Sequence, residues 1–281
     1  MKKNYCSVII ITHNSEKFIG KAIESLKNQT RNPDQILIID TGSEDLSYIY
    51  PHVQEENISL IFGGKEIGFC KGNNIGMKHV SKEAEYILLL NPDAFLFPEF
   101  IEKSIAYMND PKNSNCGMVT GKVYGYDIDK DTPTYKYDTT GIFQKWYGKW
   151  YDRGQGEECS KSLYNREEHV PAICGALMFC RKIALTDVLI NDREIFDSSF
   201  FMYKEDIDLS LRLRKKGWSL KYMPTLEAYH CRGWNPNRQN VSKYLRIHSA
   251  KNELKIHLKS YSPIPSIYSL AKYLAVSIFN Y

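Results

Sequence analysis

Apolar runs and amphipathic stretches alternate along the first third of the chain. Residues 5–12 form a continuous, largely β-branched run of the kind that a parallel strand buried on both faces produces. Apolar side chains then recur at helical spacing from Ile19 to Leu26. Further buried strands are predicted at Gln35–Asp40, Ile58–Phe62 and Tyr86–Asn91, separated by segments able to form crossover helices. This order predicts an α/β fold, a Rossmann-like domain with a mostly parallel central sheet.

The alternation stops between Tyr124 and Arg166, a stretch rich in Tyr, Trp, Gly, Asp and Lys that has no clear period. We expect a long irregular insertion with short strands there. Apolar periodicity returns at Gly175–Cys180. The spacing of the apolar residues in Tyr203–Lys216 predicts a helix, which ends with Gly217 in the C′ position.

The C-terminal segment combines cationic and apolar residues. A basic amphipathic helix is predicted over Val241–Leu258, followed by two prolines and an apolar segment, Ile267–Phe279, that is too short to cross a bilayer. Eight Lys or Arg and one acid lie in residues 232–281. This charge favours peripheral contact with an anionic membrane. Packing of the apolar face on the rest of the chain, or on a second subunit in a homodimer, would explain the pattern equally.

The composition excludes several classes of protein. The 281 residues are 43% hydrophobic and 25% charged, a globular balance that argues against disorder and repeats. The N-terminus leads into a strand rather than a signal-peptide core, so we expect a cytoplasmic protein, peripheral at the inner membrane face if its tail binds lipid. Seven cysteines without a CxxC pair argue against a disulfide framework or zinc site. The net charge is +4, and we expect no nucleic-acid partner.

Polar residues follow the predicted strands at the ends where open α/β sheets bind their ligands. The first strand ends in THN (12–14), the second in DTGS (40–43) and the fourth in NPD (91–93). The third leads into a glycine-rich stretch that contains GNN (72–74). Each motif alone has a local explanation, because an Asp after a strand is often a helix cap and a Gly-Asn run is often a turn.

As an ordered set, these and later motifs resemble glycosyltransferase family 2, and within it the rhamnosyltransferase-like branch. The resemblance extends from Val8 to about Lys259 and comprises VIIITHN, IIDTGSED, GFCKGNNIGM, ILLLNPD, CGALMFCRK and FFMYKEDIDLSLRLRKKGW. It implies an inverting enzyme with the GT-A fold. It also implies a catalytic domain over residues 1–240, with a nucleotide-sugar-binding half (1–123) and an acceptor-side half (124–240), before the basic helical tail (241–281).

The resemblance also assigns residues to the sugar-nucleotide donor. Exposed strand ends leave carboxylates, amides and hydroxyls free to bond a base N–H or a sugar hydroxyl, and glycine permits close backbone approach. For the glycine-rich segment the local alternative is a capped helix N-terminus. The donor-binding residues implied are Thr12, His13, Asn14, Asp40, Gly72, Asn73, Asn74 and Asn91.

The NPD motif stands where the family carries a metal-binding Asp-x-Asp, with Asn91 replacing the first Asp. Asp93 supplies the hard oxygen ligand that Mg²⁺ or Mn²⁺ prefers, and the donor diphosphate and waters would complete the coordination shell. Some family members also place a metal-binding His where His230 stands, and imidazole can complete an oxygen-rich Mn²⁺ site. The alternatives are a turn Asp and a structural His.

The acidic run from Glu205 to Asp208 resembles the Glu-Asp signature of the family. We expect Asp206 to be the general base, because inversion needs one carboxylate to take the proton of the attacking acceptor hydroxyl. Acids in a first helical turn also stabilise the helix dipole, so a structural role for all three acids is the alternative. Glu205 and Asp208 share one helix face, whereas Asp206 points elsewhere.

Two further segments carry candidate acceptor and leaving-group contacts. Arg side chains in the segment from Arg232 to Arg238, a candidate mobile loop, are suited to neutralising a departing diphosphate. An aromatic cluster in the insertion could stack on sugar rings, or could equally be a satellite hydrophobic cluster under a long loop. The cluster comprises Trp146, Tyr147, Trp150 and Tyr151.

These observations favour transfer of a hexose or deoxyhexose, with L-rhamnose as one candidate, from a dTDP- or UDP-sugar to a glycan or lipid-linked acceptor in cell-surface polysaccharide assembly. One rival is a catalytically degenerate sugar-nucleotide-binding or scaffold protein, against which the retained Asp93 and Asp206 argue. Another is a nucleotidyltransferase, which would usually have a glycine-rich basic loop where this chain has THNSEKF. The absence of GxGxxG after the first strand disfavours a dehydrogenase.

Overall fold

One large mixed sheet organises the protein. The computed structural model describes residues 4–159, 163–231 and 242–279. Within them, eight strands follow the order β10-β12-β6-β11-β4-β1-β2-β3, while β5 pairs with β12 and β7 with β6. Successive residues of β1 point into two different hydrophobic clusters, Ile9 into one and Val8 and Ile10 into the other. Both faces of the sheet are therefore covered.

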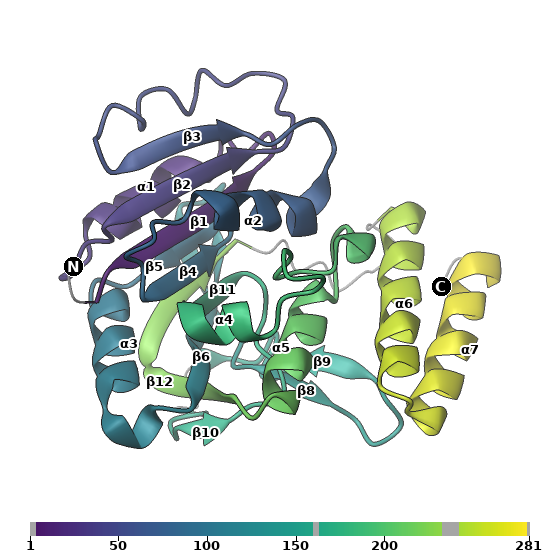
Figure 1. Cartoon of the computed structure of the whole chain (residues 1–281). Helices are drawn as coiled ribbons and strands as arrows, with labels where there is room; N and C mark the ends of the chain where they lie inside the picture. Colours follow the sequence, from purple (N-terminus) through teal and green to yellow (C-terminus); the bar gives the residue numbers. More distant parts are fainter. Residues whose placement is uncertain (1–3, 160–162, 232–241, 280–281) are drawn as a thin grey trace.

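The N-terminal half contains all four predicted strands (Figure 1). The strand from Ile58 to Phe62 lies at the edge of the sheet, however, and only Ile58 of it is buried, so the prediction that it is a buried strand was wrong. β1, β2, β3 and β4 run parallel, and the register sets Thr12 opposite Asp40. The elements are β1 (Cys6–Thr12), α1 (Ile19–Lys27), β2 (Gln35–Asp40), β3 (Ile58–Phe62), α2 (Gly68–His79), β4 (Tyr86–Leu90), β5 (Ala94–Leu96), α3 (Phe100–Asn109) and the short 3₁₀ helix η1 (Pro111–Asn113).

One connection differs from expectation. Residues 41–57, between β2 and β3, form turns instead of a crossover helix. Side chains in this segment bond to nearby backbone groups: Asp45 accepts a hydrogen bond from the N–H of Ser47 at 2.8 Å. Such local bonds compete with helix formation.

Long strands build the second half of the sheet. β6 (Cys116–Asp127) lies beside β11 (Leu177–Arg181), which runs antiparallel to both β4 and β6. β12 (Ser219–His230) is parallel to β6 and antiparallel to β5, with His230 opposite Ala94. That register brings the end of β12 next to the residues that follow β4. The short elements β10 (Glu168–His169), α4 (Lys182–Asp187) and η3 (Ser198–Phe200) complete this half.

The predicted insertion contains short strands, as expected. β6 runs into it and pairs with β7 (Thr132–Thr139). A separate two-stranded hairpin of β8 (Ile142–Gln144) and β9 (Trp150–Asp152) follows. In Figure 1 the loop that joins β8 to β9 extends beneath the two C-terminal helices.

Three helices complete the chain: α5 (Glu205–Lys215), α6 (Lys243–Lys259) and α7 (Pro263–Phe279). The α5 helix begins two residues later than expected, because Tyr203 (φ 67°) and Lys204 (φ 73°) are left-handed. It ends as predicted, with Gly217 left-handed at φ 93°.

The two C-terminal helices differ from the predicted tail. The buried face of α6 is largely polar rather than apolar, because Asn252, Glu253 and His257 find partners in the chain. The α7 helix begins at Pro263, so that both prolines lie in its first turn, where proline is tolerated. Among the described helices, none has the length and apolar character needed to cross a bilayer.

Candidate active site

Two predicted donor-binding residues meet at the ends of neighbouring strands. Thr12 ends β1 directly opposite Asp40, which ends β2. The buried Asp40 carboxylate accepts hydrogen bonds from the N–H groups of Gly42, at 2.9 Å, and Ser43, at 3.2 Å. Asp40 therefore shapes the turn after β2. His13, which follows Thr12 in the chain, is exposed.

Tyr48, which the sequence did not single out, ties these two strand ends together. Its hydroxyl lies 3.1 Å from Thr12 Oγ1 and 3.0 Å from Ser43 Oγ. Asn14, left-handed at φ 47°, adds a second link, because its Oδ1 accepts from the N–H of Glu44 at 3.0 Å. The predicted base-and-ribose site is thus an organised pair of loops.

The GNN motif of α2 faces inward. A Cβ atom on Gly72 would lie 3.0 Å from Ile11 Cγ2, so glycine lets α2 pack closely on β1. Asn73 is buried and donates to the carbonyl of Phe69 at 3.0 Å. Asn74 donates to the carbonyl of Phe196 at 2.8 Å and accepts from its N–H at 3.0 Å. These side chains are committed to packing, and their contact with a donor stays a prediction.

Asp93 and His230 lie together, as the metal-site prediction requires. His230 Nε2 is 3.2 Å from Asp93 Oδ1, because β12 pairs with β5 just after Asp93. The other ring nitrogen, Nδ1, is 2.9 Å from Oδ2 of Asp138 on β7. All three groups are largely buried, and Asp138 was not expected from the sequence. Among the described residues, no three His, Cys, Asp or Glu side chains gather into one metal-binding group.

Mutual attraction dominates the electrostatics of this trio. Burial lowers the pKa of His230, but Asp93 and then Asp138 outweigh it and raise that pKa to about 9. Burial likewise raises the pKa of Asp93, yet His230 brings it below the ordinary value of 3.8. These attractions favour a protonated His230 ring between the Asp93 and Asp138 carboxylates.

Asp206 sits in the first turn of α5 with a fixed orientation. Its Oδ2 accepts from the N–H of Gly175 at 3.0 Å, and its Oδ1 accepts from the N–H of Ile207 at 2.8 Å. The neighbouring Ala176 carbonyl accepts from the N–H of Asn91 at 3.0 Å. The turn before β11 therefore links the candidate base to the end of β4, where the metal motif lies.

Neighbouring acids have different environments. Burial, followed by repulsion from Asp206, raises the pKa of Glu205 to about 8, and Glu205 Oε2 is buried without a hydrogen-bond partner among the described residues. Burial also raises the pKa of Asp206 above 3.8. Asp208 instead binds Arg212 Nε and Lys259 Nζ, each at 2.8 Å. The structural alternative thus suits Asp208. Asp206 is partly exposed, whereas Glu205 and Asp208 are buried, and its role as the base stays a prediction.

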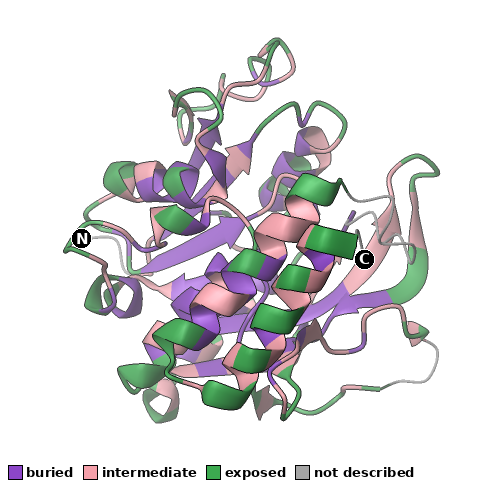
Figure 2. Cartoon of the chain, turned by 90° about the vertical axis from the view of Figure 1, so that its right-hand side faces the viewer, coloured by how far each residue is buried: buried purple, intermediate pink, exposed green. Residues whose placement is uncertain are grey.

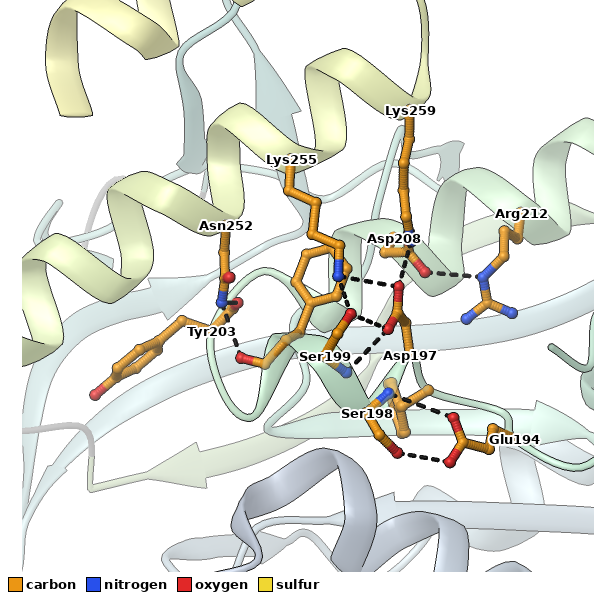
Figure 3. Close-up of polar contacts among 12 residues, drawn as sticks. Glu194, Asp197, Ser198, Ser199, Tyr203, Asp208, Arg212, Asn252, Lys255 and Lys259 are labelled. Atoms are coloured by element: carbon orange, nitrogen blue, oxygen red, sulfur yellow. Dashed lines mark hydrogen bonds and ion pairs between the residues drawn. The ribbon is translucent and has the colours of Figure 1, made fainter. Parts of the chain in front are cut away.

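The loop before α5 is held by α6 (Figure 3). Nδ2 of the buried Asn252 lies within 3.0 Å of the carbonyl oxygens of Phe200, Met202 and Tyr203. Three non-glycine residues of this loop have positive φ angles, an arrangement that persists only where surrounding contacts fix it. They are Phe201 (60°), Tyr203 (67°) and Lys204 (73°).

Ion pairs reinforce the same contact. Asp197, just before η3, pairs with Lys255 at 3.2 Å and with Lys259 at 2.6 Å. Lys259 also reaches Asp208 in the helix of the candidate base (Figure 3). The tail helix α6 therefore packs on the body of the protein, which was one of the alternatives for the tail.

Asn252→Ala should destabilise the protein by about 1–3 kcal/mol, because the carbonyls of Met202 and Tyr203 lose the Asn252 donor and that of Phe200 loses one of its donors. It should also lower kcat, since the loop that sets the start of α5 loosens. Thermal unfolding and initial rates measure the two effects. Lys251→Ala, which alters an exposed neighbour on α6, is the matched control and should change neither. Wild-type stability and kcat in Asn252→Ala would refute this role.

The aromatic cluster of the insertion does not form one platform. Trp150 is buried in the main hydrophobic cluster, and its indole N–H donates to His257 Nε2 at 3.2 Å. Trp146 is 84% exposed at the hairpin tip, next to Tyr147. For Trp150, the alternative of a hydrophobic cluster therefore applies. The proposed Arg232–Arg238 loop lies outside the described residues.

Comparisons with known proteins identify the family of this chain. The family model of Glycosyl transferase family 2 matches residues 7–184. Rhamnosyltransferase WbbL of Escherichia coli K12 is 27% identical over 247 residues, covering 86% of this chain and 88% of the relative. An N-acetylglucosaminyl-diphospho-decaprenol L-rhamnosyltransferase of Mycobacterium tuberculosis is 23% identical over 257 residues, covering 86% and 81%.

Solved structures share the fold at low sequence identity. GalNAc-T7 with UDP, GalNAc and Mn²⁺ has a TM-score of 0.66 at 13% identity; the match covers 91% of this chain but 48% of that one. The mannosyltransferase PcManGT from Pyrobaculum calidifontis, with GDP-Man and Mn²⁺, has a TM-score of 0.60 at 13% identity, covering 99% and 71%. The chain therefore belongs to glycosyltransferase family 2 and is a glycosyltransferase with the GT-A fold, similar to rhamnosyltransferases.

Proposed function

We propose that the protein transfers a deoxyhexose, L-rhamnose, from a dTDP-sugar to a lipid-linked glycan acceptor with inversion at the anomeric carbon, in the assembly of a cell-surface polysaccharide. Two relatives named as rhamnosyltransferases support the sugar, since each aligns with 86% of this chain. The second relative's name also specifies a decaprenol-linked acceptor. A UDP-hexose is the alternative donor.

In this reaction Asp206 takes the proton of the acceptor hydroxyl while that oxygen forms a bond to C1 of the donor sugar. The bond from C1 to the diphosphate breaks on the opposite face, and the nucleoside diphosphate departs. No covalent glycosyl-enzyme intermediate is needed, so one base suffices. The observation that carries this proposal is the Asp206 carboxylate, oriented by Gly175 in the turn that also bonds Asn91.

The Asp93 carboxylate and His230 imidazole fit a divalent-metal site. Their ligand atoms face one another, and Asp138 orients the second ring nitrogen, an arrangement common for metal-binding histidines. A bound metal ion would take the place of the proton on His230 Nε2. When bound, Mg²⁺ or Mn²⁺ supplies positive charge that stabilises the leaving diphosphate. We propose that Asp93 and His230 hold it, while Thr12, His13, Asn14 and Asp40 position the nucleoside and Asn91 the sugar phosphate.

The contacts of the tail suggest how the chain is divided into functional parts. We propose that residues 1–240 form the catalytic domain and that the tail supports it, as the contacts of Asn252 with the loop before α5 suggest. A scaffold protein would not need a base held by two backbone N–H groups or a buried carboxylate and imidazole pair. These features favour an active enzyme.

A donor panel tests the proposal. With Mn²⁺ present, release of nucleoside diphosphate should be fastest from dTDP-L-rhamnose among dTDP-, UDP- and GDP-sugars. NMR of the product should show the opposite anomeric configuration to that of the donor. Faster turnover of a GDP- or UDP-sugar would contradict the donor assignment, and retained configuration would contradict the single-base mechanism.

A further inference from the structure

The helix α7 presents its apolar residues to the outside. The outer face of α7 consists of exposed apolar side chains, among them Ile267 at 70% and Ile278 at 65% exposure. Figure 2 looks onto this side of the molecule, where α6 and α7 stand in front of the body. The apolar residues of this outer face recur at helical spacing: Ile264, Ile267, Leu270, Leu274, Ile278 and Phe279.

Polar residues of α7 face inward instead. Ser269 is buried and its hydroxyl lies 3.0 Å from His257 Nδ1 on α6. Lys272 forms an ion pair with the fully buried Glu253 of α6. This polarity is opposite to that of a helix on a water-exposed surface, so the contact with α6 leaves the apolar face of α7 uncovered.

The β8–β9 hairpin extends this surface. Tyr147 packs against Tyr268 of α7 with ring centroids 5.0 Å apart, and a Cβ on Gly148 would come within 2.7 Å of Pro265. The exposed indole of Trp146, which contacts Tyr147, therefore lies near the start of α7, and Tyr261 just before α7 is 93% exposed. Trp and Tyr are the residues that favour the interface between water and lipid.

The two C-terminal helices and the hairpin tip carry exposed positive charge. Glu253 is the single acid in residues 242–279, and it is buried and paired. Lys243 and Lys251 of α6 and Lys145 at the hairpin tip are exposed. A second copy on the same face would bring two cationic surfaces together without acids to pair them. An anionic surface complements both the charge and the apolar face.

We propose that the outer face of α7, with the hairpin tip at Trp146, docks on an anionic lipid bilayer, with α7 lying in the plane of the interface. This inference rests on the proposed function, because docking on a membrane would bring the enzyme to a lipid-linked acceptor. Its evidence is independent, because it comes from residues outside the donor and base sites.

Sedimentation of the full chain with vesicles tests the proposal. The protein should bind vesicles that contain phosphatidylglycerol, and should bind less to pure phosphatidylcholine or at high salt. The double variant Ile267→Glu with Leu274→Glu should weaken binding by at least about tenfold, because it replaces two exposed apolar side chains with anions. Phe62→Glu, at an exposed site on β3, is the control and should bind like the wild type.

Two further readouts separate the possible outcomes. The double variant should keep wild-type turnover of a water-soluble acceptor, so loss of vesicle binding is distinguishable from failure of the glycosyltransferase reaction. Sedimentation velocity of the free protein should show a monomer. Absence of vesicle binding, equal binding by the double variant, or a dimer that this variant dissociates would overturn the proposal, and the last result would assign the face to a second copy.

Discussion

Asp206→Asn should lower kcat on the order of 10²-fold or more while leaving donor binding nearly unchanged. The amide has almost the same shape as the carboxylate, and its oxygen can still accept a hydrogen bond from the Gly175 N–H. It cannot take a proton from the acceptor hydroxyl. Steady-state rates at saturating donor and calorimetric titration with nucleoside diphosphate measure the two quantities separately.

The pH profile gives a second readout of the same residue. Burial raises the pKa of Asp206, and it raises that of its neighbour Glu205 to about 8. Wild-type kcat/KM should therefore rise with pH along a limb above the ordinary Asp pKa of 3.8, and the apparent value belongs to the pair. Asp206→Asn should lose this limb as well as its rate.

Asp208→Asn is the matched comparison within the same helix turn. Because Asp208 pairs with Arg212 and Lys259, its substitution should chiefly lower stability. If Asp208→Asn retained the wild-type unfolding temperature and lost more activity than Asp206→Asn, the assignment of the base would be wrong.

Removal of divalent metal with EDTA should abolish turnover, and added Mn²⁺ or Mg²⁺ should restore it. Asp93→Ala should weaken metal-dependent binding of nucleoside diphosphate and leave metal-free binding much less affected. His230→Ala should act in the same direction. Titration of Mn²⁺, followed by its effect on nucleotide affinity, measures both variants; full activity in chelator would contradict metal dependence.

Substitution of Asp138 tests whether this residue orients the proposed metal ligand His230. Asp138→Asn keeps a hydrogen-bond acceptor near His230 Nδ1 but removes the charge, so metal affinity should fall by about 10- to 100-fold. Asp129→Asn changes an exposed acid of the same insertion and should leave the affinity unchanged. Equal affinity in Asp138→Asn and the wild type would remove Asp138 from the site.

Much of the fold was predictable because the buried strands are short and nearly continuous in apolar residues. The strand from Cys6 to Thr12 has polar neighbours just beyond its end, and parallel pairing then brings Thr12 opposite Asp40. His230 had a less direct signal. Only the family resemblance suggested that His230 lies near Asp93. The pairing of β12 with β5, which brings the two residues together, was not predicted.

The residues that were not predicted have contact partners far away in the sequence. Asp138 is one of several acids in the insertion, and nothing in its neighbours marks it as buried against His230. Tyr48 lies in a segment expected to be helical, where its bond to Thr12 had no local signal. Asn252 resembles a polar residue on a solvated helix face, since its partners are carbonyl groups that every residue type carries.

The hydrogen bonds of Asn252 to main-chain carbonyls have an evolutionary consequence. Asn252 holds the loop through the carbonyls of Phe200, Met202 and Tyr203, and of these three residues only Phe200 also has a fully buried side chain. We therefore expect the exposed side chain of Tyr203 and the half-buried one of Met202 to tolerate replacement while the base stays in place. Enzymes that share this contact between Asn252 and the loop before α5 can change the residues that recognise the acceptor while the catalytic base keeps its position.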